Sequence, residues 1–308
     1  MTVTRLTGNR ILLVMTGLLI YCWASVSFAQ DTEPRRWAQI PTGVNFFGMG
    51  YNYSDGDIFF DPVLKIEDGV FELHGVGVSY IRTLAFMGKS ARVDFTLPYK
   101  AGRWEGLLDG EYVSVRRRGP GDARARFSVL LYGGPAENLR EFSKSKKSNT
   151  VVGAALAVTM PTGDYNSERL INLGANRWVI RPQMGVTHSR GKWTGEVTGS
   201  LFLYADNNHF FQDTKLETDP LFAAQAHLIY TFRPGLWTSI SAAYGWGGEA
   251  TINGDAKNNP SGNWLTAISF GFPIDRKQGI KIAWIRGRTQ KPTGADVDSL
   301  LLGYSLMF

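Results

Sequence analysis

The chain has 308 residues, 44% of them hydrophobic, with a formal net charge of +6 and a single cysteine, Cys22. Removing the first 29 residues, which carry Arg5 and Arg10 and no acidic residue, lowers the charge to +4 and leaves 279 residues, enough for two soluble domains or one barrel. The charges are spread along the chain, which excludes a nucleic-acid surface, and losing Cys22 with the first 29 residues excludes disulfide and thiolate chemistry in the rest.

The first predicted element is a secretory signal. Arg5 and Arg10 precede an apolar run over 11–20, and small residues lead up to Ala29, which is the charged, apolar, small order of a cleaved signal peptide. A membrane-anchoring helix is the alternative, but it requires about 20 apolar residues. The expected domains are a signal peptide over 1–29, a periplasmic N-terminal segment over 30–43 and a transmembrane β-barrel over 44–308. The N-terminal segment is too short to be a plug domain.

Alternation of apolar and polar residues recurs along the rest of the chain. In 91–100 every odd position is apolar and every even position is charged, polar or proline, which is the pattern of a strand with one lipid-facing and one wet face. No stretch after residue 30 approaches the roughly 18 apolar residues of a membrane helix. Twelve strands are predicted near 44–54, 74–85, 91–101, 123–133, 150–160, 177–188, 193–205, 221–232, 236–246, 263–273, 279–288 and 298–308.

Strand length and connection length both favour a membrane barrel. About eleven residues at 3.3 Å each, tilted near 45°, rise roughly 25 Å, the height of the apolar band of such barrels. Lipid offers backbone amides no partners, so a spanning sheet must close on itself. Short connections are expected in the periplasm at 87–90, 189–192, 233–235 and 275–278, and long ones outside at 55–73, 102–122, 161–176, 206–220, 247–262 and 289–297. The sequence therefore predicts an all-β fold, a transmembrane antiparallel up-and-down barrel of about 12 strands.

One periplasmic connection is longer than the others, and residues 134–142 are expected to hold a short capped helix there. Tryptophans are expected at the two membrane boundaries, as amphipathic rings prefer, although core tryptophans of a soluble β-sandwich are the alternative. These tryptophans are Trp178, Trp193, Trp246 and Trp264. Apolar residues then alternate over 300–308 up to Phe308, a pattern that resembles the signal read by the barrel assembly machinery.

The polar side chains expected to face the lumen are the candidates for a solute path. They are Arg92, Asp94, Arg177, Arg181, Gln183, Glu196, Gln225 and His227. Two interpretations remain open, because such charges form either a polar constriction that selects solutes or a neutralised ladder that plugs a small barrel. Small inward-facing residues, Gly153, Ala155 and Ala157, leave room for a solute in the lumen. At the outer end of its strand, Arg177 either guards a pore mouth or ties down a loop.

Catalysis and metal binding are not expected. A lipase-like site would require a serine near His227 and an orienting acid or amide, and the sequence contains no nucleophile elbow. The remaining histidines, His74, His188 and His209, lie on separate segments without the spacing of a zinc site, so we expect no metal and no cofactor.

Two features of the predicted outer loops point to binding. The run over 116–118 is three arginines, which either contact lipopolysaccharide phosphates or are simply solvated. The loop that contains Phe210 and Phe211 either folds over the mouth as a landing site for apolar solutes or is mobile.

Several motifs resemble one known family. Residues 171–178 read Ile-Asn-Leu-Gly-Ala-Asn-Arg-Trp and residues 225–232 read Gln-Ala-His-Leu-Ile-Tyr-Thr-Phe, and with Pro161-Thr162-Gly163-Asp164-Tyr165 they are similar to the outer-membrane transporter family named for the meta-pathway of phenol degradation. The resemblance runs from about residue 41 to the end of the chain. It implies uptake of small aromatic or otherwise hydrophobic compounds across the outer membrane.

The sequence and the resemblance together favour a monomeric passive uptake channel in the cell outer membrane. Its expected partners are the lipid bilayer, lipopolysaccharide, the assembly machinery through Phe308 and a small-molecule solute. A structural or adhesion barrel with a closed lumen is the alternative, and a lipid-modifying enzyme is the third possibility.

Overall fold

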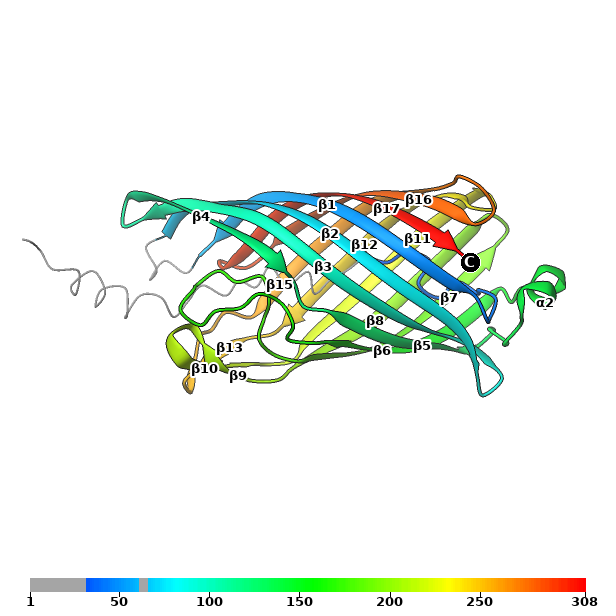
Figure 1. Cartoon of the computed structure of the whole chain (residues 1–308), viewed down its shortest axis with the longest axis horizontal. Coiled ribbons are helices and arrows are strands. Elements are labelled where there is room, and N and C mark those ends of the chain that lie inside the picture. Colours follow the sequence, from blue (N-terminus) through cyan, green and yellow to red (C-terminus); the bar gives the residue numbers. More distant parts are fainter. Residues whose placement is uncertain (1–31, 61–65) are drawn as a thin grey trace, which may run out of the picture.

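The structure is a computed structural model that describes residues 32–60 and 66–308, so the predicted signal peptide over 1–29 lies outside the described residues. The described residues form one closed antiparallel barrel of twelve long strands, as predicted (Figure 1). The barrel strands are β1 (Asn45–Phe59), β2 (Ile66–Phe86), β3 (Lys89–Leu108), β5 (Arg124–Tyr132), β6 (Thr150–Thr159), β7 (Val179–Arg190), β8 (Trp193–Tyr204), β11 (Leu221–Arg233), β12 (Leu236–Gly247), β15 (Ser261–Pro273), β16 (Gln278–Thr289) and β17 (Gly294–Met307). Pairing of β1 with β17 closes the sheet. Within the described residues, no helix is long and apolar enough to cross a membrane.

The predicted alternation holds around the barrel. On β11, Phe222 and Leu228 point outward and are about half exposed, whereas His227 and Ile229 point inward and are buried. The outward set is apolar on strand after strand, because those side chains face lipid and not water. Its most exposed members include Met49, Leu97, Met184, Ile240 and Leu300. The four predicted boundary tryptophans are all in this outward-facing set.

The two ends of the barrel differ as expected. At the short-turn end, Met87 and Gly88 both have positive φ angles, the geometry of a tight hairpin turn whose twist matches the strands. The same end carries α2 (Leu139–Lys144), within the longer connection where a capped helix was predicted (Figure 1). A capping box closes its first turn, because Asn138 accepts the N–H of Glu141 and Glu141 accepts the N–H of Asn138.

The long-loop end contains strands that the sequence pattern does not predict. These are β4 (Glu111–Pro120), which pairs with the outer half of β3, and a separate small sheet of β9 (Asn207–Phe210), β10 (Thr214–Thr218), β13 (Ala250–Ile252) and β14 (Asp255–Ala256), with a 3₁₀ turn at Phe211–Asp213. Phe210 and Phe211 are buried in this small sheet against Leu216 and Ile252. The expectation that these two rings offer a landing site is therefore wrong, because they form the core of the loop sheet.

Candidate functional site

The N-terminal segment, residues 32–43, lies against the inner wall of the barrel. Trp37 is 0% exposed, and its indole Nε1 donates a hydrogen bond to Thr198 Oγ1 at 2.7 Å. The ring lies over the paired glycines Gly153 and Gly185, where an added Cβ would come within 2.1 Å of it. A segment in the periplasm was expected, whereas around Trp37 the chain lies inside the barrel. The space left by small inward-facing residues is occupied by the chain itself.

Four buried or half-buried charged residues, Glu33, Arg36, Asp94 and Arg126, tie this segment to β3 and β5, and we call them the lumen charge cluster. Arg36 Nη1 and Arg126 Nε donate to the same Asp94 oxygen at 3.0 and 2.9 Å. Arg126 Nη1 also donates to both oxygens of Glu33 at 3.0 and 2.7 Å, and Arg36 donates to Ser128. Breaking a buried ion pair by removing one partner typically costs about 3–5 kcal/mol, so these contacts hold the segment in the lumen.

Side chains of the wall also satisfy the backbone of the segment. Glu196 on β8 accepts the N–H of Arg36 at 3.0 Å and that of Trp37 at 3.4 Å. Gln225 on β11 accepts the N–H of Glu33 at 3.4 Å. Backbone donors that enter a barrel away from any strand need such partners, and the polar inward faces of β8 and β11 provide them.

A serine and a histidine lie side by side in the lumen wall. His227 is opposite Ser241 in the β11–β12 register, with Nδ1 2.7 Å from Ser241 Oγ and Nε2 3.1 Å from Gln225 Oε1. A lipase-like site would require this kind of trio. However, Ser241 lies in mid-strand and is paired on both sides, so its backbone N–H belongs to the sheet and does not form an oxyanion hole. We interpret the trio as a row of cross-strand polar contacts.

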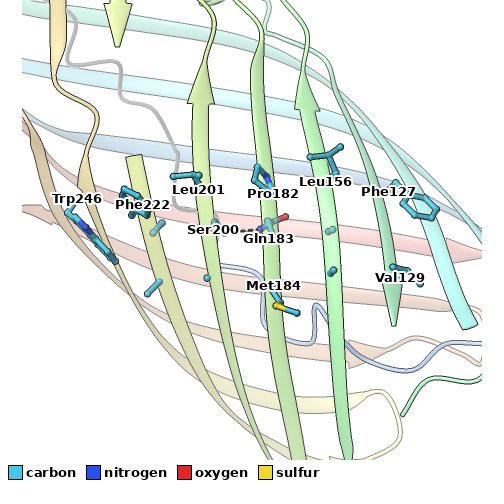
Figure 2. Close-up of a pocket in the computed structure, with 15 residues that line it drawn as sticks. Phe127, Val129, Leu156, Pro182, Gln183, Met184, Ser200, Leu201, Phe222 and Trp246 are labelled. Carbon is cyan, nitrogen blue, oxygen red and sulfur yellow. Dashed lines mark hydrogen bonds between the residues drawn. The ribbon is translucent and has the colours of Figure 1, made fainter. Parts of the chain in front are cut away.

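A recess in the barrel wall is centred on β7 and β8, and Figure 2 shows the side chains that line it. Pro182 has no N–H to donate, and the β7–β8 ladder is interrupted between the Ile180–Leu203 pair and the Gln183–Ser200 pair. We call the resulting space of about 730 Å³ the wall cavity. Its lining includes outward-facing residues and, behind them, inward-facing ones. The lining residues are Phe127, Val129, Ala154, Ala155, Leu156, Pro182, Gln183, Met184, Gly199, Ser200, Leu201, Phe222, Ala223, Ala224 and Trp246.

The wall cavity is apolar on its lipid side and has one polar contact on its lumen side. Large rings such as Phe222 and Trp246 stack beside it, while Gly199 has no atom within 4 Å of its Cβ position and leaves it open. Behind it, Gln183 Nε2 donates to Ser200 Oγ at 3.2 Å, the contact drawn as a dashed line in Figure 2. The wall cavity is therefore an apolar recess with the hydrogen-bonded pair of Gln183 and Ser200 on its lumen side.

The family and the fold follow from comparison with known proteins. A model of the family described as "Putative MetA-pathway of phenol degradation" matches residues 65–294. The chain belongs to this family. Its structure is similar to the crystal structure of the COG4313 outer membrane channel from Pseudomonas putida F1, with 21% identity, a TM-score of 0.76, and coverage of 90% of this chain and 100% of that chain.

A more distant likeness is to the beta domain of the Bordetella autotransporter BrkA, with 8% identity, a TM-score of 0.50, and coverage of 86% of this chain and 99% of that chain. No curated protein matches the sequence significantly. The fold that this family member shares with both structures is that of outer-membrane β-barrels.

In this member of the phenol-degradation family, the structure separates the predicted lumen residues into three groups. Arg92, Asp94, Glu196, Gln225 and His227 surround the N-terminal segment, Arg181 and Gln183 lie on β7 beside the wall cavity, and Arg177 lies at the long-loop end. Among the described residues, no group of three or more His, Cys, Asp or Glu is arranged to hold a metal ion.

Arg177 connects the barrel to the loop sheet. It is 6% exposed, donates to Thr218 Oγ1 at 2.5 Å and lies 4.5 Å over the ring of Tyr204. Close by, burial raises the pKa of Tyr165, whose hydroxyl donates to the His209 carbonyl at 3.0 Å. These contacts favour the interpretation of Arg177 as a loop anchor.

Four important residues of the lumen were not predicted: Glu33, Arg36, Trp37 and Arg126. A signal for Arg126 exists in the sequence, because Arg124, Arg126 and Ser128 alternate with Ala125 and Phe127 and so share the inward face of one strand. The N-terminal segment carries no such periodicity, and the lumen partners of Glu33, Arg36 and Trp37 lie 58 to 192 residues away in the chain.

Proposed function

We propose that this family member takes up small hydrophobic or aromatic, phenol-like compounds passively across the outer membrane, with its short-turn end in the periplasm. The observation that carries the proposal is the wall cavity, because it connects the lipid-facing side of β7 and β8 with inward-facing side chains. The centre of the lumen, in contrast, contains the N-terminal segment and its ion pairs. Apolar solutes partition favourably into an apolar recess, whereas hydrated solutes do not.

The test fills the wall cavity from the lipid side. Gly199→Phe adds a ring where the Cβ position has no neighbour within 4 Å, so it closes the recess without a backbone clash. We expect the initial rate of uptake of radiolabelled phenol and of a radiolabelled alkylbenzene, measured in Gram-negative cells that produce the protein, to fall to that of cells without it. Ionic conductance of the purified protein in planar bilayers should not change.

The matched control is Gly195→Phe. Gly195 lies on the same face of β8, also has no neighbour within 4 Å of its Cβ position, and is not in the lining of the wall cavity. Both variants must show the heat-dependent electrophoretic mobility of a folded barrel. Wild-type uptake by a folded Gly199→Phe variant, or equal loss in both variants, would contradict the proposal.

A structural or adhesion barrel with a closed lumen is the second candidate, and the N-terminal segment inside the lumen favours it. It predicts no difference in solute uptake between cells with and without the protein, so the same assay separates the two functions.

We also propose that the outer face of β4 contacts lipopolysaccharide phosphates. Arg116 and Arg118 are exposed on the outward-facing side, and the structure gives neither an ion-pair partner within the described residues, whereas Arg117 donates to the Ile171 carbonyl. Replacing both exposed arginines by glutamine should lower the lipopolysaccharide that co-purifies with the barrel, and an unchanged ratio would contradict the contact. Contact between Phe308 and the assembly machinery, and cleavage after Ala29, stay predictions.

A further inference from the structure

A second cavity, the short-turn cavity, lies beneath the N-terminal segment at the end of the barrel that carries α2 (Figure 1). Its volume is about 220 Å³, and it is distinct from the wall cavity because the two share no lining residue. Both apolar and charged residues line it. The residues that matter here are Trp37, Phe142 and Ile229 among the apolar ones, and Arg35, Lys147 and Glu196 among the charged ones.

Arg35 is held in an unusual position within this cavity. It has a φ angle of 67°, in the left-handed region that non-glycine residues rarely adopt, and such strain typically marks functional positions. Its neighbours Arg36 and Trp37 contact β3 and β8, whereas the guanidinium of Arg35 lies 5.5 Å over the ring of Trp237 on β12. Its Nη1 is buried, and no described residue accepts a hydrogen bond from it. A buried cationic donor without an acceptor is costly, so the site favours an anion that supplies one.

The other charges of the cavity already have partners. Lys147 Nζ donates to Glu137 Oε2 at 3.2 Å, to Ser145 Oγ at 2.7 Å and to the Phe142 carbonyl at 2.6 Å. The hydrogen bond from Ser145 lowers the pKa of Glu137, which keeps that carboxylate charged beside Lys147. Glu196 accepts two backbone N–H groups of the N-terminal segment. Glu196 also attracts Arg35 electrostatically, but Arg35 Nη1 is left without a hydrogen-bond acceptor among the described residues, so Arg35 has a donor to offer a ligand.

Size and chemistry define the ligand class. An apolar cavity of about 150 Å³ holds a benzene molecule, so 220 Å³ leaves room for one ring and a small polar group. A guanidinium binds a carboxylate through two parallel hydrogen bonds. We propose that the short-turn cavity binds a small amphiphilic carboxylate, with its carboxylate on Arg35 and its apolar body against Trp37 and Phe142. This inference goes beyond the proposed uptake function and does not depend on the wall cavity.

The test measures binding of 4-fluorobenzoate to the full-length barrel in detergent micelles by ¹⁹F NMR. We expect saturable binding by the wild type and binding about tenfold to a hundredfold weaker in Arg35→Gln, the range for loss of a hydrogen bond to a charged group. Fluorobenzene, which has the ring without the carboxylate, and acetate, which has the carboxylate without the ring, should each compete poorly.

The matched control is Arg233→Gln. Arg233 is an exposed arginine at the same end of the barrel and lies outside the cavity lining, so this variant loses the same charge without changing the site. Arg35→Lys keeps the charge and should retain part of the binding, which shows that a weak Arg35→Gln variant is not simply misfolded. Wild-type affinity in Arg35→Gln, equal loss in Arg233→Gln, or equal binding of fluorobenzene would each overturn the inference.

Failure of this site is distinguishable from failure of the uptake function. Suppose that Gly199→Phe loses phenol uptake but Arg35→Gln binds 4-fluorobenzoate as the wild type does. This result would overturn the binding site and leave the uptake function in place. Binding that depends on Arg35 in a protein that takes up no phenol would support the site and contradict the uptake function.

Discussion

Two regions of the barrel differ in what fills them. The lumen between β3, β5 and β8 is charged, and the N-terminal segment occupies it through Arg36, Trp37 and their partners. The wall between β7 and β8 is apolar, and there the sheet itself is interrupted at Pro182. The protein's own chain therefore lies in the polar lumen, whereas the apolar wall cavity lies where the ladder is interrupted.

The difference bears on the proposed uptake function, because ion pairs fill the lumen whereas the wall cavity is apolar. Closing the sheet satisfies its backbone groups, but it also forces any solute through a narrow lumen. Proline is tolerated where a ladder hydrogen bond is dispensable, and the β7–β8 ladder is interrupted at Arg181 and Pro182. The filled lumen and the wall cavity lie in different parts of the barrel, so each can be changed separately.

The largest effect is expected from Asp94→Asn, which breaks the lumen charge cluster. The change leaves Arg36 and Arg126 buried beside a neutral amide, which typically costs about 3–5 kcal/mol. The N-terminal segment should leave the lumen for a larger fraction of the time, so single-channel conductance in planar bilayers should rise and the segment should become sensitive to protease. Uptake of phenol through the wall should change little.

The control for this variant is Asp55→Asn, which removes the same charge from an exposed position on β1. If a folded Asp94→Asn barrel conducts no better than Asp55→Asn, the cluster does not hold the segment in place.

The barrel can be predicted from the sequence because each strand shows the alternation of apolar and polar residues by itself. Alternation over 91–100 identifies both the strand and the inward position of Asp94 without knowledge of any partner. The position of the N-terminal segment cannot be predicted in this way, because the partners of Arg36 and Trp37 come near them only when the barrel closes. Strands of two to five residues in the loop sheet were missed for the same reason, because they are too short to show a period.

A smaller effect is expected from Gly185→Val, which fills the recess that receives the ring of Trp37. An added Cβ would lie 2.1 Å from the indole Nε1, and such overpacking typically costs about 1–3 kcal/mol. We expect a moderate rise in conductance by the same assay. The double variant with Trp37→Ala should conduct no more than Trp37→Ala alone, because the clash needs the ring.

Gly195→Val is the control, since the Cβ position of Gly195 has no neighbour within 4 Å. Additive effects of Gly185→Val and Trp37→Ala would show that Gly185 acts on conductance by another route than the indole.

The smallest effect is expected at the wall, where Gln183 and Ser200 form the polar contact behind the wall cavity. The double variant Gln183→Leu with Ser200→Ala removes both partners, so it leaves no buried group unsatisfied and loses a hydrogen bond of about 0.5–1.5 kcal/mol. The lumen side of the wall cavity then becomes as apolar as its lipid side. Because the side-chain contact contributes no more than that energy, we expect phenol uptake to rise by no more than about tenfold, its rate equivalent.

Ser269→Ala is the control for this last variant, because Ser269 is buried on the inward face of β15 and lies outside the wall cavity. Conductance should stay at the wild-type level in both, since neither touches the N-terminal segment. A faster uptake of phenol with unchanged conductance would separate the apolar path from the polar one. Slower uptake would mean instead that Gln183 and Ser200 form hydrogen bonds with the hydroxyl of the solute. Passage of a solute that made only apolar contacts would not be slowed by the loss of their hydrogen-bonding groups.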